Sequence, residues 1–203
     1  MRSADKKLVL VARIFLFVIY FVGLTGISLP SMRSVFVSLT PYTLLISILI
    51  LLAFHWKWDL RFIAAIVLIA LAGLGVEVLG VQTGLIFGEY SYGPVLGVKI
   101  GEVPLMIALN WVLLIYCSYF LAGKLFRAAL LKIALAAALM VGMDVLMEPV
   151  AIDLNMWNWE VEIPPLQNYA AWFFISFLFA GFFHVMKVKI LNPLAGYLFL
   201  FLV

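Results

Sequence analysis

Long uninterrupted apolar segments are the feature that most limits what this chain can fold into. Several of them approach the roughly 20 residues that a helix needs to cross the hydrocarbon core of a bilayer. The backbone polar groups of such a segment must be satisfied within the segment, which favours helices. The apolar segments cover residues 8–29, 35–54, 62–80, 103–122, 129–149, 170–186 and 193–203. The sequence therefore predicts an all-α fold, a polytopic membrane helix bundle of about seven transmembrane helices.

The composition and length agree with a single membrane domain. Charged residues make up 11% of the 203 residues and hydrophobic residues 67%, whereas soluble domains carry about 25% charged residues. This length suits one integral membrane domain over 1–203 and leaves no room for a separate soluble module. The last apolar segment, 193–203, would span only about 16 Å as a helix, so we expect a partial seventh helix there.

Two prolines bear on where the helices begin and end. Pro41 follows Thr40, and this pair allows two structures. One is a short helix capped by Thr40 with proline at its first position, and the other is a longer helix kinked at Pro41. Pro149 is expected to end or kink the fifth helix.

The basic residues predict the orientation of the chain, because positive charges favour the cytoplasmic side. Only Arg33 and Lys99 fall on the outer side when successive loops alternate. The other 11 of the 13 Lys and Arg residues share the inner side: Arg2, Lys6, Lys7, Arg13, Lys57, Arg61, Lys124, Arg127, Lys132, Lys187 and Lys189. We therefore expect a multi-pass protein of the cell membrane with a cytoplasmic N-terminus. Because these cations lie at helix ends and form no patch, nucleic acid is not an expected partner.

The acidic residues are distributed in the opposite way. Asp5 and Asp59 fall on the inner side. The other eight of the 10 are in or near the outer half: Glu77, Glu89, Glu102, Asp144, Glu148, Asp153, Glu160 and Glu162. Acidic residues contribute little to the orientation of insertion, so this split requires another cause. Ionisable groups within membrane helices are costly and usually functional, which points to a site in the outer half.

Three acids within the apolar segments are the candidate catalytic residues. Asp144 and Glu148 are four positions apart near the outer end of the fifth helix, so their side chains share one face. Glu77 is near the outer end of the third helix, and Asn110 lies early in the fourth helix, which starts on the same side. We expect these four side chains to converge on one pocket. The alternative is that the acids are structural and hydrogen bonded to neighbouring helices.

The setting of Asp144 and Glu148 predicts that at least one of them carries a proton near neutral pH. Burial, a neighbouring carboxylate and the negative end of the helix dipole all disfavour the charged form. Only Arg33 and Lys99 on the outer side oppose these effects. A neutral carboxylic acid in an apolar cavity can donate a proton to a substrate. His55 and His184 lie at the inner ends and Cys117 is the single cysteine, so no metal site is expected.

Two outer loops are rich in aromatic residues together with glycine or proline. The loop at 82–94 contains Glu89, Tyr90 and Tyr92. The loop at 153–169 contains Trp157, Trp159, Pro164, Pro165, Asn168 and Tyr169. One interpretation is an aromatic belt at the membrane interface. The other is that both loops fold over the cavity mouth as a lid and line a groove for a long apolar ligand.

Several sequence blocks follow one another in an informative order. They are Glu77-Val78-Leu79-Gly80-Val81-Gln82-Thr83-Gly84 with Phe87-Gly88-Glu89-Tyr90-Ser91-Tyr92, Val103-Pro104-Leu105 with Asn110-Trp111, Asp144 with Glu148-Pro149, Trp157-Asn158-Trp159, and Pro165-Leu166-Gln167-Asn168-Tyr169 with Trp172. Together these blocks resemble the membrane carotenoid biosynthesis proteins that include the carotenoid hydratases of the CruF type. The resemblance covers about residues 70–175. Each block alone is weak, and their combination is fairly specific.

The resemblance implies addition of water to the terminal isolated double bond of an acyclic carotenoid, which gives a tertiary alcohol. In this chemistry Asp144 or Glu148 protonates the alkene, and Glu77 stabilises the tertiary cation or deprotonates the incoming water. No metal or redox cofactor is needed. The expected partners are the carotenoid, the lipid bilayer and other carotenoid biosynthesis enzymes. The residues expected to bind the substrate are Asn110, Glu89, Tyr90, Tyr92, Trp111, Trp157, Trp159, Asn168, Tyr169 and Trp172.

Three other functions are compatible with parts of the sequence. A carotenoid cyclase would use the same protonation but let a neighbouring double bond capture the cation, so water access to the pocket discriminates the two. A magnesium-dependent prenyltransferase could use Asp144 and Glu148 as ligands, but it needs cations for a diphosphate, and the outer side offers two. A non-catalytic carotenoid-binding protein or proton-coupled carrier is the third, although a carrier often shows paired repeats, and none is evident.

Overall fold

A computed structural model describes residues 6–161 and 163–202 of the chain. Arg2, Asp5 and Glu162, which contribute to the charge distribution, lie outside the described residues. In chain order the elements are α1 (Lys6–Ser28), α2 (Arg33–Ala53), α3 (Leu60–Thr83), β1 (Tyr90–Tyr92), β2 (Lys99–Ile100), β3 (Val103–Pro104), α4 (Leu105–Leu125), α5 (Ala129–Asp153), β4 (Trp157–Trp159), α6 (Leu166–Val185) and α7 (Ala195–Leu202).

The helices follow the apolar segments of the sequence, so the predicted membrane helix bundle is confirmed. Over the described residues, α1 to α6 have the length and apolarity to cross a membrane. Helix α7 has 8 residues and extends about 12 Å, so it does not cross. Six helices of the described residues are thus long and apolar enough to span a membrane, and the seventh is partial, as the length of its apolar segment indicated.

Both prolines lie inside helices. Pro41 is in the middle of α2, which begins at Arg33, so the short helix with proline at its first position is wrong. Helix α5 continues past Pro149 to Asp153, so this proline does not end the helix. Prolines are tolerated within membrane helices because neighbouring groups satisfy the backbone carbonyl that the ring leaves without a donor.

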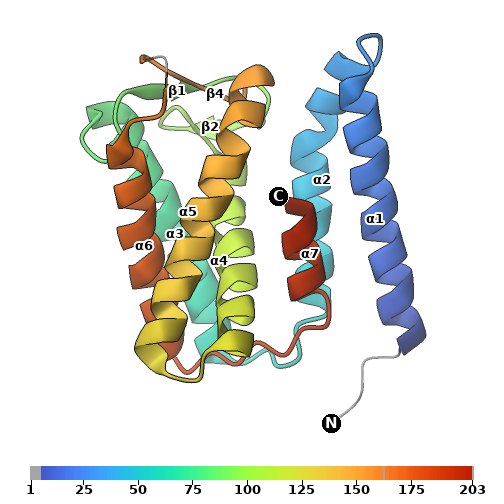
Figure 1. Ribbon diagram of the computed structural model, residues 1–203, viewed down its shortest axis with the longest axis vertical. Helices are drawn as coiled ribbons and strands as arrows, with labels where there is room; N and C mark the ends of the chain where they lie inside the picture. Colours follow the sequence, from blue (N-terminus) through green and yellow to red (C-terminus); the bar gives the residue numbers. More distant parts are fainter. Residues whose placement is uncertain (1–5, 162, 203) are drawn as a thin grey trace.

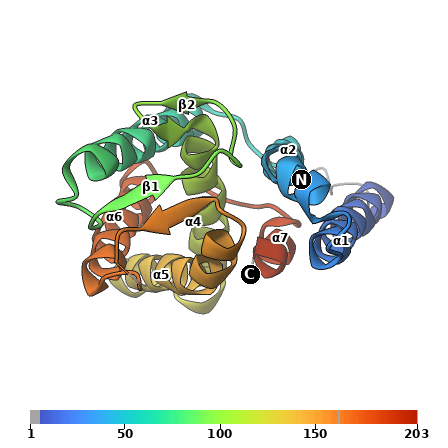
Figure 2. The ribbon, with the colours of Figure 1, turned by 90° about the horizontal axis from the view of Figure 1, so that it is seen from above.

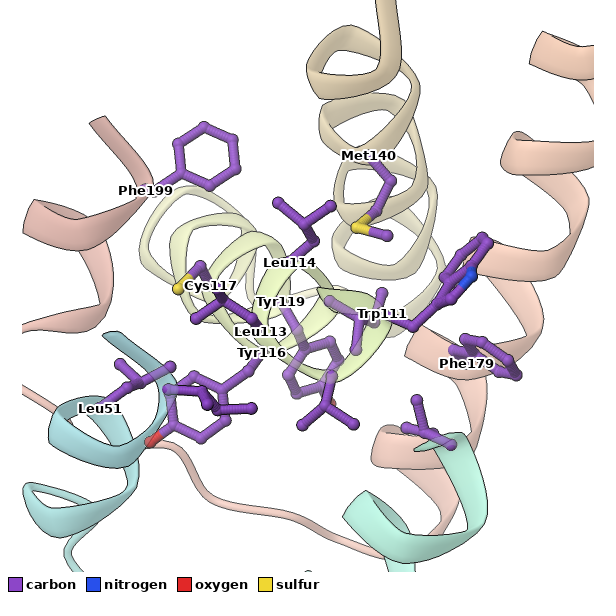
Figure 3. Close-up of a cluster of buried hydrophobic side chains, with 14 of the residues drawn as sticks. Leu51, Trp111, Leu113, Leu114, Tyr116, Cys117, Tyr119, Met140, Phe179 and Phe199 are labelled. Atoms are coloured by element: carbon purple, nitrogen blue, oxygen red, sulfur yellow. The ribbon is translucent and has the colours of Figure 1, made fainter. Parts of the chain in front are cut away.

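Helix α4 is the centre of the bundle. It buries 67% of its apolar stretch, whereas no other spanning helix buries more than 33%. Helices α1, α2 and α7 lie on one side of α4, and α3, α5 and α6 lie on the other (Figures 1 and 2). Figure 3 shows the buried side chains of α4 between these groups, with Leu51 of α2, Met140 of α5, Phe179 of α6 and Phe199 of α7. The remaining helices present apolar faces outward, as lipid requires.

Two short antiparallel sheets cap one end of the bundle, opposite the N-terminal end of α1 (Figure 1). Strands β2 and β3 pair locally, and β1 pairs with β4 from the other aromatic loop. The register places Tyr90 opposite Trp159 and Tyr92 opposite Trp157. Both segments were expected to be loops, so these strands are a structural finding. They join two segments that are far apart in the sequence into one unit over the bundle.

Candidate active site

A cavity lies under the β1–β4 sheet, among the ends of α3, α4, α5 and α6. Its lining combines carboxyl groups with a wall of aromatic rings. The residues that line it are Glu77, Phe87, Tyr90, Tyr92, Ile107, Asn110, Trp111, Asp144, Met147, Glu148, Trp157, Trp159, Asn168 and Trp172. The three candidate acids therefore come together, although α3 and α5 are separated by α4 in the sequence.

Glu77 is held by three hydrogen-bond donors. The Tyr90 and Tyr92 hydroxyls donate to its Oε2 at 2.6 and 2.8 Å, and Trp111 Nε1 donates to its Oε1 at 2.9 Å. Glu77 is 3% exposed. Donors aimed at both carboxyl oxygens stabilise the charged form and offset part of the cost of burying it.

A glycine one turn below Glu77 allows Trp111 to reach it. A Cβ added at Gly73 would lie 2.9 Å from two atoms of the Trp111 ring system. Only glycine lets the indole pack this closely against α3 without displacement. Gly73 was not expected as a site residue, because its importance depends on which side chain of α4 faces it.

Asp144 and Glu148 have different hydrogen-bond partners despite sharing one face of α5. Asn168 Nδ2 donates to Asp144 Oδ2 at 2.6 Å. Trp157 Nε1 and Trp159 Nε1 both donate to Glu148 Oε2, at 3.0 and 2.9 Å. Asp144 is within electrostatic range of both Glu148 and Glu77. Asp144 thus has a single neutral donor in a cluster of acids, which is the setting that most favours a bound proton.

The β1–β4 sheet explains how two loops supply the roof of the cavity. Side chains alternate between the faces of a strand, so Tyr90 and Tyr92 share one face while Ser91 points outward and is exposed. Trp157 and Trp159 share the same inner face of β4. The alternation Tyr-Ser-Tyr and Trp-Asn-Trp is visible in the sequence and was the available signal for this sheet.

The two roof tyrosines act as donors over the whole physiological pH range. Burial raises the pKa of Tyr90 well above its ordinary value, and the nearby charge of Glu77 raises it further. The same two causes, in the same order, raise the pKa of Tyr92. Both phenols therefore keep their protons and continue to donate to Glu77.

Aromatic faces make up most of the remaining wall. Four of the 6 tryptophans in the chain line this cavity. Trp111 and Trp172 stack with ring centroids 4.4 Å apart, and the Tyr90 and Trp159 rings lie 5.1 Å apart. The space open to the centre of a water molecule is about 30 Å³, which is room for about two waters. The cavity can therefore hold water beside acids and aromatic rings.

The structure brings together most of the residues expected from the sequence. Glu89 and Tyr169 are the exceptions, because neither lines the cavity. The Glu89 side chain is exposed, and its carbonyl oxygen accepts the Glu160 N–H of the facing strand segment. Conversely, Phe87, Ile107 and Met147 line the cavity and were not expected. Nothing in their sequence context distinguishes these apolar residues from lipid-facing neighbours.

The described residues contain no cluster of three or more His, Cys, Asp and Glu side chains arranged to hold a metal ion. Asp144 and Glu148 instead accept hydrogen bonds from Asn168 and from two indoles. Their hydrogen-bonded oxygens are therefore directed at uncharged donors rather than at a shared ion.

Comparison with known families identifies the protein's group. Residues 32–195 match the model of the family described as carotenoid biosynthesis protein. The chain belongs to the carotenoid biosynthesis protein family. The resemblance inferred from the sequence blocks is thereby confirmed, and every residue that lines the cavity lies within the matched range.

A curated relative of the chain has a named activity. The chain is 34% identical over 122 residues to a bisanhydrobacterioruberin hydratase of Haloarcula japonica. The match covers 56% of this chain and 42% of the relative, so the chain spans less than half of the relative's length. No solved structure matches this protein.

Proposed function

We propose that this protein adds water to the terminal double bond of an acyclic carotenoid end and forms a tertiary alcohol. The proposal rests mainly on one observation, the unequal hydrogen bonding of three acids in one water-sized aromatic cavity. The name of the Haloarcula japonica relative supports the same reaction class. Hydration needs an acid, a cation-tolerant cavity and water beside a base, and these residues can supply each.

Asp144 is the proposed proton donor. Its one donor is a neutral amide, whereas Glu77 accepts three hydrogen bonds and Glu148 accepts two. Because hydrogen bonds to a carboxyl group favour its charged form, Asp144 is the acid most able to remain protonated beside two carboxylates. Its proton is transferred to the less substituted alkene carbon, and the positive charge develops on the tertiary carbon.

The walls of the cavity stabilise this cation until water captures it. The faces of Trp111, Trp172 and Tyr90 attract a positive charge, and the Glu77 carboxylate adds charge stabilisation. A water oxygen then bonds to the tertiary carbon while Glu77 or Glu148 accepts its proton. Transfer of that proton back to Asp144 restores the starting state, so the net change is one water added and no redox step.

The test is hydration in cells that make lycopene. Cells with the unmodified protein should accumulate pigment that is heavier by one or two waters, with little colour change because the attacked bond is outside the conjugated system. Asp144→Asn keeps size and hydrogen bonding but cannot donate the proton, and it should lower the hydration rate about 100-fold or more. Glu160→Gln, an exposed acid next to β4, is the matched control and should retain full activity.

Two results would contradict the proposal. A product of unchanged mass and altered colour would show that the protein is a cyclase, in which a double bond rather than water captures the cation. Full hydratase activity in Asp144→Asn, Glu148→Gln and Glu77→Gln alike would show that the carboxyl groups are structural.

The substrate and product are apolar, so we also expect exchange with other carotenoid enzymes through the bilayer.

A further inference from the structure

A second cavity adjoins the acid cavity and is almost wholly apolar. It has a volume of about 250 Å³ and lies between α2 and α5, with α4 and α7 at its sides. Ile107, Asn110, Met147 and Trp157 line both cavities. The two cavities are therefore adjacent, and the shared wall between them contains the polar Asn110 side chain.

The apolar space continues from there to the lipid-facing side of the molecule. A third cavity of about 570 Å³ lies between α1, α2 and α7. It shares Tyr20, Ile27, Thr40, Leu44 and Phe201 with the second one. We call the second and third cavities together the apolar groove. Figure 2 shows that α1, α2 and α7 stand apart from the α3, α5 and α6 group. The second cavity is lined by residues of α4 and of both groups, whereas the third lies among α1, α2 and α7.

The chemistry of the groove selects an uncharged chain. None of the described residues that line it is charged. The hydroxyl of Tyr20 lies 3.0 Å from Ser47 Oγ and is already hydrogen bonded. A ligand with a diphosphate would find no cation here, so the lining excludes a charged isoprenoid in favour of a hydrocarbon.

The length of the groove also fits a long chain. Its α1 wall extends from Phe17 to Ile27, which is about 15 Å along the helix axis, and the second cavity extends it to the acid cavity. Arg33 of α2 and Asp153 at the end of α5 form an ion pair that joins the two helices at the strand-bearing end. A long hydrocarbon ligand would thus lie below this ion pair, with one end at Asn110 and the rest directed toward α1.

We infer that the apolar groove binds the polyene arm of the carotenoid while its terminal double bond enters the acid cavity past Asn110. This inference rests on the proposed function and adds to it the path and binding residues of the substrate. The family match begins at residue 32 and ends at 195, so the groove walls on α1 and at Phe201 lie outside it.

Blocking the groove tests the inference. Leu44→Trp and Leu146→Trp place a large ring in the groove from α2 and α5. Each should lower hydration of a full-length carotenoid at least about tenfold. Leu49→Trp and Val145→Trp are matched controls on the same helices, because both side chains are exposed and line neither cavity. A short acyclic isoprenoid hydrocarbon with the same terminal group has no polyene arm, so all four variants should hydrate it at the unmodified rate.

A binding measurement separates this inference from the proposed function. A photoreactive residue at position 44, in cells making lycopene, should become covalently linked to the pigment, and the same residue at position 49 should not. Pigment linked at position 44 without any hydrated product would support binding in the groove and overturn the proposed hydratase function. Absence of pigment at 44, or linkage to phospholipid chains alone, would overturn the groove. Normal hydration of the carotenoid by both folded groove variants would also overturn it and leave the hydratase intact.

Discussion

At the scale of single residues, the three acids differ in their donors rather than in their burial. Glu77, Asp144 and Glu148 are all buried, at 3%, 2% and 4% exposed. Glu77 accepts hydrogen bonds from two phenols and an indole, Asp144 from one amide, and Glu148 from two indoles. A buried acid with several donors is stabilised as a carboxylate, and one with few favours the neutral form. The base and acid roles that we propose for these residues therefore depend on side chains from α4, α6 and the two strands.

Tyr92→Phe tests whether the donors of Glu77 matter for the reaction. The change removes one of three hydrogen bonds and keeps the ring. A hydrogen bond to a charged group contributes about 1.5–3 kcal/mol, so we expect the hydration rate to fall about tenfold or more and Tm to decrease. The rate and Tm in detergent are the measurements. Tyr42→Phe, at an exposed tyrosine of α2, is the control. A lower Tm with an unchanged rate would mean that Tyr92 supports only the fold.

At the scale of elements, the β1–β4 pair is the unit that completes the site. Four of its six residues face the cavity, and two of them donate to Glu77 while the other two donate to Glu148. The pairing continues beyond β1, where the Gly93 N–H donates to the Met156 carbonyl at 2.9 Å. Lys99 Nζ also donates to the Tyr92 carbonyl at 2.6 Å, which holds the strand from its other side. The sheet therefore couples α3 to α5 through side chains that neither helix carries.

Gly93→Ala should disrupt this sheet. An added Cβ would lie 1.9 Å from the Asn155 carbonyl oxygen, so the backbones of the two segments would have to separate. Overpacking of this kind costs about 1–3 kcal/mol or more. We expect normal membrane insertion, a lower Tm and loss of most hydration activity. Gly75→Ala, whose added Cβ meets nothing within 4 Å, should be neutral in the same assays. Equal activity of the two variants would show that the sheet is not needed for the reaction.

At the scale of the whole molecule, a cluster of cations and the acid cavity lie at opposite ends of the helix bundle. The acid cavity lies at the strand-bearing end, and the connections α2–α3, α4–α5 and α6–α7 lie at the end where α1 begins (Figure 1). Cations from three segments meet at this second end and line one surface pocket. They are Lys57 of the α2–α3 connection, Arg61 in the first turn of α3, and Lys187 and Lys189 after α6. Asn192, in the connection between α6 and α7, donates hydrogen bonds to the Leu51 carbonyl of α2 and to the Tyr116 hydroxyl of α4, and so joins these segments.

The orientation of the bundle is the prediction at this scale. The end with the clustered cations should be cytoplasmic, because positive residues are retained on that side. Reporter fusions at Lys124 and at Asp153 should therefore give opposite signals, cytoplasmic for the first and external for the second. A cytoplasmic signal at Asp153 would invert the topology and place the acid cavity on the inner side of the membrane.

The sequence by itself determined the helices, the family and the three acids, because each depends on local information. Membrane helices are set by uninterrupted apolar length, and the i, i+4 spacing of Asp144 and Glu148 fixes their shared face wherever α5 lies. The tertiary structure alone decided which donors each acid meets, since Trp111, Asn168 and the paired strands come from other segments. It also decided that Glu89 does not line the acid cavity and that residues of α1, α2, α4, α5 and α7 line an apolar groove. Those outcomes depend on contacts between distant segments, and in an apolar sequence a groove-lining leucine and a lipid-facing leucine have the same chemistry.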